Sequence, residues 1–176
     1  MKVTLYMAMT ANGMIAREND DAPWSKGVWK EYYKFIKQKR NIIIGRRAYE
    51  LMNSVNEFEK LKFPVSVVLS NNIQQAGKNV FFVNSPEEAL EIMKKNKIKN
   101  AVVGGGSKCN ASFLKAGLID EIYLDIEPWI FGKGIKLFDE TTAEAKLTLI
   151  GTRKLSKNTI RLIYKVKKSG KEKTKY

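Results

Sequence analysis

The stretch AVVGGGSKCNASFLKAGLIDEIYLDI, residues 101–126, decides the fold of this chain. A short apolar run at residues 101–103 stops at three consecutive glycines, and Ser107 then begins a segment with helical spacing. Glycine lets the backbone take positive φ and lets a ligand come close, while the free N–H groups of a new helix favour an anion. The order strand, glycine turn, helix therefore predicts a phosphate site. It is not a G-x-G-x-x-G motif, because Cys109 stands in place of the third glycine.

The same order of elements recurs elsewhere in the chain. Buried strands are predicted at residues 2–9, 41–44, 64–69 and 80–83. Helices are predicted to follow Ser25, Gly45 and Ser85. The chain then continues with a strand at residues 118–128, a turn at 132–134, and a hairpin formed by residues 145–155 and 159–167. Strands that alternate with helices, followed by strands alone, predict an α/β sheet with an antiparallel edge.

The strand ends of such a sheet are where a ligand is expected. Ligands of open α/β sheets bind beyond the carboxyl ends of the parallel strands. We therefore expect Gly13, Gly45, Ser70 and the triple glycine to meet at one rim. Residues 10–24, which are rich in Asn, Asp and turn formers, predict a long and functional loop beside that rim.

Composition excludes several kinds of chemistry. The chain has no histidine, which removes Ser-His-Asp and Cys-His catalysis as well as histidine-bound metals. Its one cysteine, Cys109, allows no internal disulfide and no cysteine-cluster zinc site, so no metal is expected. Any proton transfer must therefore use carboxylates, tyrosine, lysine or water.

Length and charge bear on partners and location. With 176 residues and 44% hydrophobic content, the chain is expected to form one domain. Its first nine residues are too short for a membrane span and do not resemble a signal peptide, so a cytoplasmic protein without membrane contact is expected. The formal charge of +14 attracts polyanions, but the excess is concentrated at residues 165–175 and otherwise scattered along helix faces. That distribution favours a solvated surface and a basic disordered tail at residues 168–176 over a nucleic-acid site.

Five segments together resemble the dihydrofolate reductase superfamily. They are MAMTANGMIARENDDAPW (7–24), IIIGRRAYE (42–50), VVLSNN (67–72), VVGGGS (102–107) and GLIDEIYLDIEPWIFGKGIKLF (117–138). The first is similar to the nicotinamide-covering loop of true dihydrofolate reductases. The last is similar to the reductase domain of riboflavin biosynthesis and its stand-alone relatives. The resemblance covers residues 2–166 and implies a single-domain, three-layer fold at residues 1–167, with a mostly parallel central sheet and a C-terminal antiparallel hairpin.

The resemblance also implies that the chain binds NADPH. The implied contacts are Ala8, Asn12 and Ile15 at the nicotinamide end; Gly45, Arg46, Arg47 and Ala48 at a helix start that holds phosphate; Leu69, Ser70 and Asn71 beside the adenosine; and Val103, Gly104, Gly105, Gly106 and Ser107 at the pyrophosphate. Physical chemistry supports the arginine pair independently, because forked, charge-assisted hydrogen bonds suit the extra 2′-phosphate of NADPH.

The substrate side departs from the folate enzymes. They hold the pterin with a carboxylate at the start of the first helix, but the matching residue is Trp29. Glu31 lies about 200° around the helix from Trp29, so both cannot point into one pocket. Asp125 is the catalytic candidate instead, since it falls where the folate enzymes have a threonine that bonds the missing acid. An ordinary strand-end aspartate is the alternative. The expected substrate contacts are Tyr6, Trp24, Trp29, Tyr33 and Asp125, with core packing as the alternative for the helical aromatics.

Three functions follow from these residues. The first is an NADPH-dependent reductase that transfers hydride to a pterin, with dihydrofolate favoured by the N-terminal loop and Trp24. The second is the 5-amino-6-(5-phosphoribosylamino)uracil reductase of riboflavin biosynthesis, favoured by the GLIDE strand and the missing acid. The third is a non-catalytic protein that binds nucleotides or nucleic acid. Folate enzymes of this fold are commonly monomers and riboflavin-type relatives dimers; a homodimer is the expectation.

Overall fold

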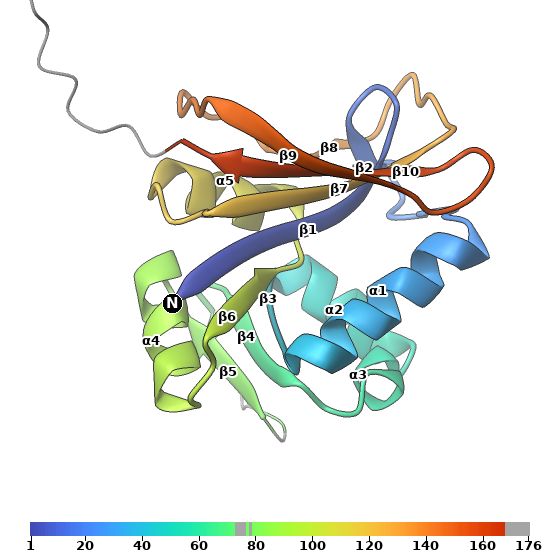
Figure 1. Cartoon of the computed structure of the whole chain (residues 1–176). Coiled ribbons are helices and arrows are strands. Elements are labelled where there is room, and N and C mark those ends of the chain that lie inside the picture. Colours follow the sequence, from blue (N-terminus) through green and yellow to red (C-terminus); the bar gives the residue numbers. More distant parts are fainter. Residues whose placement is uncertain (73–76, 78, 168–176) are drawn as a thin grey trace, which may run out of the picture.

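Eight strands form the main sheet, which has helices on both faces (Figure 1). The computed structural model describes residues 1–72, 77 and 79–167, so the predicted tail at residues 168–176 lies outside the described residues. The strands are β1 Lys2–Thr10, β3 Asn41–Gly45, β4 Val65–Leu69, β5 Val80–Val83, β6 Asn100–Val103, β7 Glu121–Glu127, β9 Leu147–Lys154 and β10 Ile160–Val166. Their order is β5-β4-β3-β6-β1-β7-β10-β9. The strands from β5 to β7 in this order are parallel to one another, whereas β10 is antiparallel to β7 and to β9. The predicted sheet and hairpin are confirmed.

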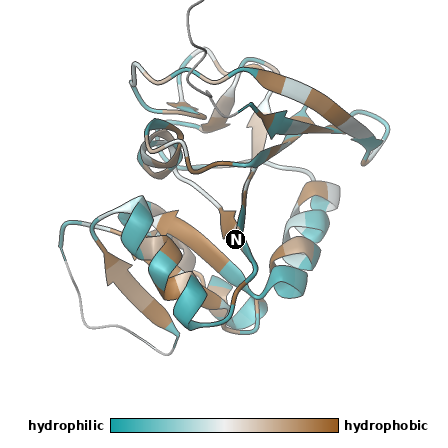
Figure 2. Cartoon of the chain, turned by 60° about the vertical axis from the view of Figure 1, so that its left-hand side comes forward, coloured by the Kyte–Doolittle hydropathy of each residue, from teal (hydrophilic) through white to brown (hydrophobic). Residues whose placement is uncertain are grey.

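The helices divide the core into two clusters. They are α1 Lys26–Lys39, α2 Arg46–Ser54, α3 Glu57–Lys60, α4 Pro86–Lys95 and α5 Ser107–Lys115. One cluster packs α4 and α5 against the sheet and includes Leu5 and Phe113. The other packs α1 and α3 against the opposite face and includes Tyr6, Ile36 and Phe58. Leu5 and Tyr6 are neighbours on β1 that face opposite sides, as the two-residue period of a strand requires. Figure 2 shows hydrophobic residues along the strands between the two helix layers.

Serine caps begin two of the helices, as the sequence predicts. The Ser25 hydroxyl accepts from the Val28 N–H at 3.4 Å, and the Ser85 hydroxyl accepts from the Glu88 N–H at 3.2 Å. Each cap satisfies a backbone donor that the helix itself leaves unpaired. In the described part of the chain, no helix is both long and apolar enough to cross a membrane.

The predicted long loop at residues 10–24 is partly wrong. Met14–Ala16 form β2, which pairs antiparallel with β8, Ile135–Lys136, as a separate two-stranded ribbon. Gly134 makes the pairing possible, because a Cβ there would lie 2.6 Å from the backbone oxygen of Ala16. The short helix α3 was also not predicted. Strands of two or three residues are too short for an alternating pattern to indicate them.

Replacing Gly134 with alanine is expected to destabilise this ribbon. The new methyl group would overlap the Ala16 carbonyl, which is backbone and cannot turn aside as a flexible side chain could. Overpacking of this kind costs about 1–3 kcal/mol, measurable as a lower free energy of unfolding in urea. Gly132→Ala is the matched control in the same turn, because nothing lies within 4 Å of its added Cβ. Equal stability of the two variants would contradict the close contact.

Candidate functional site

The carboxyl ends of β3, β4 and β6 meet at one rim of the sheet. The Gly45 N–H donates to the Gly105 carbonyl at 2.8 Å, which joins the turn after β3 to the turn after β6. Gly45 is also in register with Leu69 at the end of β4. Three predicted cofactor segments are therefore brought together: Gly45, Arg46, Arg47 and Ala48; Leu69, Ser70 and Asn71; and Val103, Gly104, Gly105, Gly106 and Ser107.

The triple glycine is packed on one side and open on the other. A Cβ on Gly104 would lie 2.7 Å from Ile42 Cδ1 in the core. Gly105 has a φ of +95°, and its added Cβ would lie 3.0 Å from the Met7 side chain. A Cβ on Gly106 would meet nothing within 4 Å. Packing therefore favours glycine at positions 104 and 105. Gly106 leaves the N–H groups at the start of α5 open to a ligand.

The two helices that begin at this rim have no side-chain cap. α2 follows Gly45 and α5 follows Gly106, and neither glycine has a side chain that could accept a hydrogen bond. The other described helices of nine or more residues, α1 and α4, have the serine caps given above. Unpaired N–H groups at the positive end of a helix dipole form a ready site for an anion. These two helix starts therefore fit the phosphate groups of a dinucleotide.

The two arginines at the start of α2 have different surroundings. Arg46 is half exposed, and its Nη1 lies 3.6 Å from Glu50 Oε1 one turn along the helix. Such an exposed pair contributes roughly 0–1 kcal/mol, so it competes weakly with an incoming anion. Arg47 instead pairs with Asp20 in the loop before α1, with Nη2 2.6 Å from Oδ2. That contact was not predicted.

The predicted nicotinamide contacts lie where β1 continues past the rim. Ala8 is in register with Asp125 on β7, and Ile15 is buried in β2. The side-chain amide of Asn12 is already bonded to the backbone of Phe131: Nδ2 donates at 2.8 Å and Oδ1 accepts at 3.3 Å. Asn12 therefore fastens the loop after β1 to the loop after β7. Its predicted cofactor contact stays a prediction.

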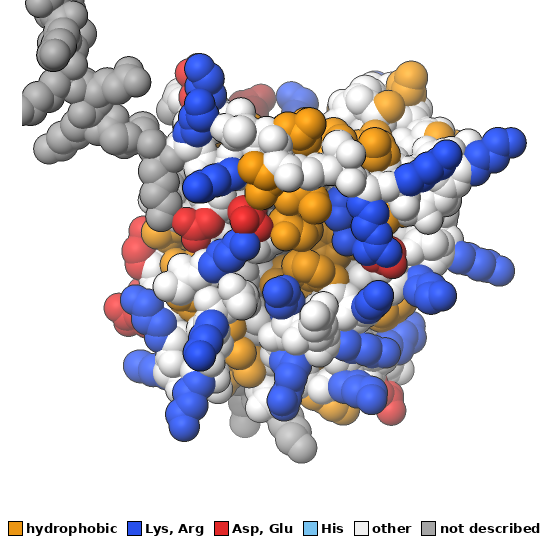
Figure 3. Space-filling view, viewed as in Figure 1, with side chains coloured by type: hydrophobic (Ala, Val, Ile, Leu, Met, Phe, Trp, Pro, Cys, Tyr) orange, Lys and Arg blue, Asp and Glu red, His pale blue; other side chains and the backbone are white. Residues whose placement is uncertain are grey.

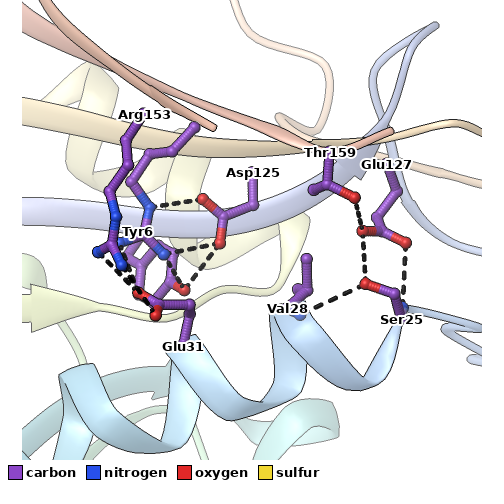
Figure 4. A network of polar contacts seen from close by, with 9 residues as sticks. Tyr6, Ser25, Val28, Glu31, Asp125, Glu127, Arg153 and Thr159 are labelled. Carbon is purple, nitrogen blue, oxygen red and sulfur yellow. Dashed lines mark hydrogen bonds and ion pairs between the residues drawn. The ribbon is translucent and has the colours of Figure 1, made fainter. Parts of the chain in front are cut away.

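Asp125 belongs to a buried charge network between the sheet and α1 (Figure 4). Its Oδ1 accepts from Arg161 Nε at 2.6 Å, and its Oδ2 accepts from Arg161 Nη2 and the Tyr6 hydroxyl, both at 2.8 Å. Glu31 of α1 adds a second carboxylate, 3.6 Å from Arg161 and 3.0 Å from Arg153. Asp125 is 0% exposed and Arg161 5%. The predicted catalytic role of Asp125 stays a prediction, and these contacts give the residue a stabilising role.

Tyr6 and Arg161 keep their protons in this network. Burial raises the pKa of Tyr6, and the charge of Asp125 raises it further, so the hydroxyl remains a donor. Burial lowers the pKa of Arg161, but the hydrogen bond to Asp125 and the charges of the surrounding acidic groups together outweigh that effect, so the pKa is raised. A charged guanidinium therefore faces Asp125 beneath the helix.

A second buried carboxylate on β7 holds the start of α1. Glu127 is 2% exposed and accepts three hydrogen bonds. The donors are the Ser25 N–H at 3.0 Å, the Ser25 hydroxyl at 2.9 Å and the Thr159 hydroxyl at 2.8 Å. Sequence reasoning did not single out Glu127, although the pattern Asp-Ile-Glu places it on the same face of the strand as Asp125.

The residues predicted to form one aromatic pocket lie in three separate places. Tyr6 is buried in the charge network, whereas Trp24 stacks on Phe131 with ring centres 6.2 Å apart. Trp29 and Tyr33 line a hollow on the outer side of α1, together with Lys26, Lys30, Lys34 and Lys37. Because Glu31 faces the network, Trp29 faces away from it, as the 200° separation predicts. The substrate contacts predicted for these aromatic residues stay predictions.

Basic side chains are spread widely over the surface. Figure 3 shows Lys and Arg across one whole face of the molecule, without a single continuous stripe. Hydrophobic side chains gather near the centre of the same face. This distribution agrees with the expectation of a solvated basic surface.

Known proteins share both the sequence pattern and the fold. A family model described as the RibD C-terminal domain matches residues 1–160. YwjB of Bacillus subtilis (strain 168) is 30% identical over 158 residues, which cover 86% of this chain and 91% of YwjB. Dihydrofolate reductase type 15 of Escherichia coli is 27% identical over 128 residues, 73% of this chain and 78% of that one. The diaminohydroxyphosphoribosylaminopyrimidine deaminase/5-amino-6-(5-phosphoribosylamino)uracil reductase of Thermotoga maritima shares the fold, with a TM-score of 0.72 at 18% identity, over 94% of this chain and 56% of that one.

Asp125→Asn is expected to destabilise the protein, because it removes the carboxylate that bonds Nε and Nη2 of the buried Arg161 and leaves only Glu31, 3.6 Å away, as its charge partner among the described residues. Breaking a buried pair in this way costs about 3–5 kcal/mol, read from urea unfolding. Glu31→Gln is the control, because it removes a carboxylate from the same network. One partner of Glu31, Arg153, is largely exposed, and the other, Arg161, lies 3.6 Å away and keeps Asp125, so about 1 kcal/mol or less is expected. An Asp125→Asn variant with parental stability and lost turnover would instead support the catalytic role.

Proposed function

The chain belongs to the RibD C-terminal domain family, and on that premise we propose that it is an NADPH-dependent reductase of a pterin or aminopyrimidine ring. Its relatives include reductases, which makes an oxidoreductase the broad class. The observation that supports the proposal most is the rim itself. Two uncapped helix starts, α2 and α5, meet there through the 2.8 Å bond from Gly45 to Gly105.

Several parts of the rim contribute to cofactor binding in this function. NADPH supplies the hydride when it is bound. The N–H groups at the starts of α2 and α5 bind its phosphates, and the glycines let the backbone approach them without a Cβ in the way. Arg46 adds a half-exposed positive charge.

Two substrates are supported by different observations. Dihydrofolate is supported by the N-terminal loop with Trp24 and by the relationship to dihydrofolate reductase type 15. The 5-amino-6-(5-phosphoribosylamino)uracil alternative is supported by the family match and by Trp29, which stands where the folate enzymes have an acid. A non-catalytic nucleotide-binding protein is the third candidate, and the expected homodimer stays a prediction.

Oxidation of NADPH, followed by the absorbance of the reduced nicotinamide, tests these candidates. Turnover with one of the two substrates alone identifies the acceptor. Tight NADPH binding with turnover of neither would favour the non-catalytic protein. A chain that binds no NADPH at all would contradict the proposal.

Arg46→Ala is expected to weaken NADPH binding by roughly ten- to a hundred-fold, the equivalent of one charged phosphate contact. Calorimetry or fluorescence titration measures the change. Lys94→Ala removes the same charge from the end of α4 and serves as the control. If both variants bind NADPH as the parent does, Arg46 does not contact phosphate.

A further inference from the structure

A carboxylate from the loop before α1 forms an ion pair with one of the two arginines at the start of α2, beside the proposed phosphate site. Asp20 Oδ2 accepts a hydrogen bond from Arg47 Nε at 2.8 Å and forms an ion pair with Nη2 at 2.6 Å. Arg47 Nη2 also donates to the backbone oxygen of Glu18 at 3.4 Å. Arg47 stands in the first turn of α2, beside the uncapped N–H groups that follow Gly45. A carboxylate therefore already neutralises the charge of an arginine that stands beside the proposed phosphate site.

Asp20 is held in a formed turn of this loop. Its φ is 68°, and its N–H donates to the Arg17 carbonyl at 3.0 Å. Arg17 in turn pairs with Asp21, and its guanidinium carbon lies 5.0 Å from the centre of the Phe131 ring. The Asp20 side chain is only 19% exposed, whereas that of Arg47 is 63% exposed. The loop thus presents a fixed carboxylate to a guanidinium that solvent can reach.

Arg47 is the polar link between this loop and α2. Among the hydrogen bonds and ion pairs of the described residues, those of Arg47 alone connect residues 17–24 to that helix. The base of the loop is fixed elsewhere, by Asn12 on Phe131 and by the pairing of β2 with β8. Loss of the Arg47 bonds would therefore remove the polar link between this loop and α2 and leave the base of the loop in place.

We propose that Asp20 is a specificity-determining residue that occupies Arg47 until a cofactor phosphate displaces it; the inference rests on the proposed function. A phosphate monoester carries more charge than a carboxylate and offers three acceptor oxygens. It can accept a forked pair of hydrogen bonds from Arg47 and also the N–H groups of α2, which Asp20 does not use. Cofactor binding then frees residues 17–21 from α2, and ligands without phosphate leave the pair intact.

Titration of the full chain with NADPH and with NADH tests this inference. Asp20→Asn removes the charge, and asparagine keeps the positive φ with little strain. Asp21→Asn makes the same charge change one residue away, at a side chain that pairs with Arg17 and not with α2. We expect Asp20→Asn to tighten NADPH binding roughly two- to five-fold, the range of an exposed ion pair, and Asp21→Asn to leave it unchanged. A gain for NADPH alone assigns Arg47 to the 2′-phosphate and supports the inference. An equal gain for NADH would contradict the specificity role of Asp20.

The double variant Asp20→Asn/Arg47→Ala shows whether the effect passes through Arg47. Compared with Arg47→Ala alone, it should bind NADPH with the same affinity. A gain that persists without Arg47, or parental affinity in Asp20→Asn, would overturn the inference and leave the proposed function standing. No NADPH binding by the parent would overturn both.

Discussion

The close approach of the Gly45 and Gly105 backbones is the constraint on which the site depends. The Gly45 N–H donates to the Gly105 carbonyl, and the Gly104 N–H donates to the Ile43 carbonyl, both at 2.8 Å. Any side chain at Gly104 would push against Ile42 in the core. Because the two turns are held this close, α2 and α5 start at one rim although they cover opposite faces of the sheet. Gly104 fits against the core, whereas Gly45 and Gly106 leave the two helix starts without a side-chain cap.

Buried charges then fix α1 over the sheet. A buried ion pair stabilises a protein only when its hydrogen bonds are complete, because desolvation is costly. Asp125 meets this condition, since Arg161 and Tyr6 together bond both of its oxygens. Glu127 forms no ion pair with any residue that the structure describes, but both of its oxygens accept hydrogen bonds, from one backbone N–H and two hydroxyls. The two acids of β7 therefore position α1 from below, and Trp29 lies on the far side of that helix from Glu31.

Much of the fold could be predicted from the sequence because its signals are local. The serine caps of α1 and α4, the glycine turns and the apolar strands each depend on a few consecutive residues, and the structure confirms these elements. The pairing of β2 with β8 depends on contact between distant, very short segments, which no periodic pattern indicates. Arg161 was missed for a related reason: an arginine that alternates with Leu162 is expected to face solvent, and only the helix above it buries the side chain. Asp20 and Arg47 are likewise distant in sequence, and no local pattern pairs them.

Amide hydrogen exchange with and without NADPH tests the central claim most directly, since it reports on each backbone N–H. The account predicts slower exchange at residues 45–48 and 104–108 when NADPH is present, because these groups bond to phosphate and lie at the rim. Unchanged exchange in both segments, with protection appearing only along α1 or elsewhere in the fold, would contradict it.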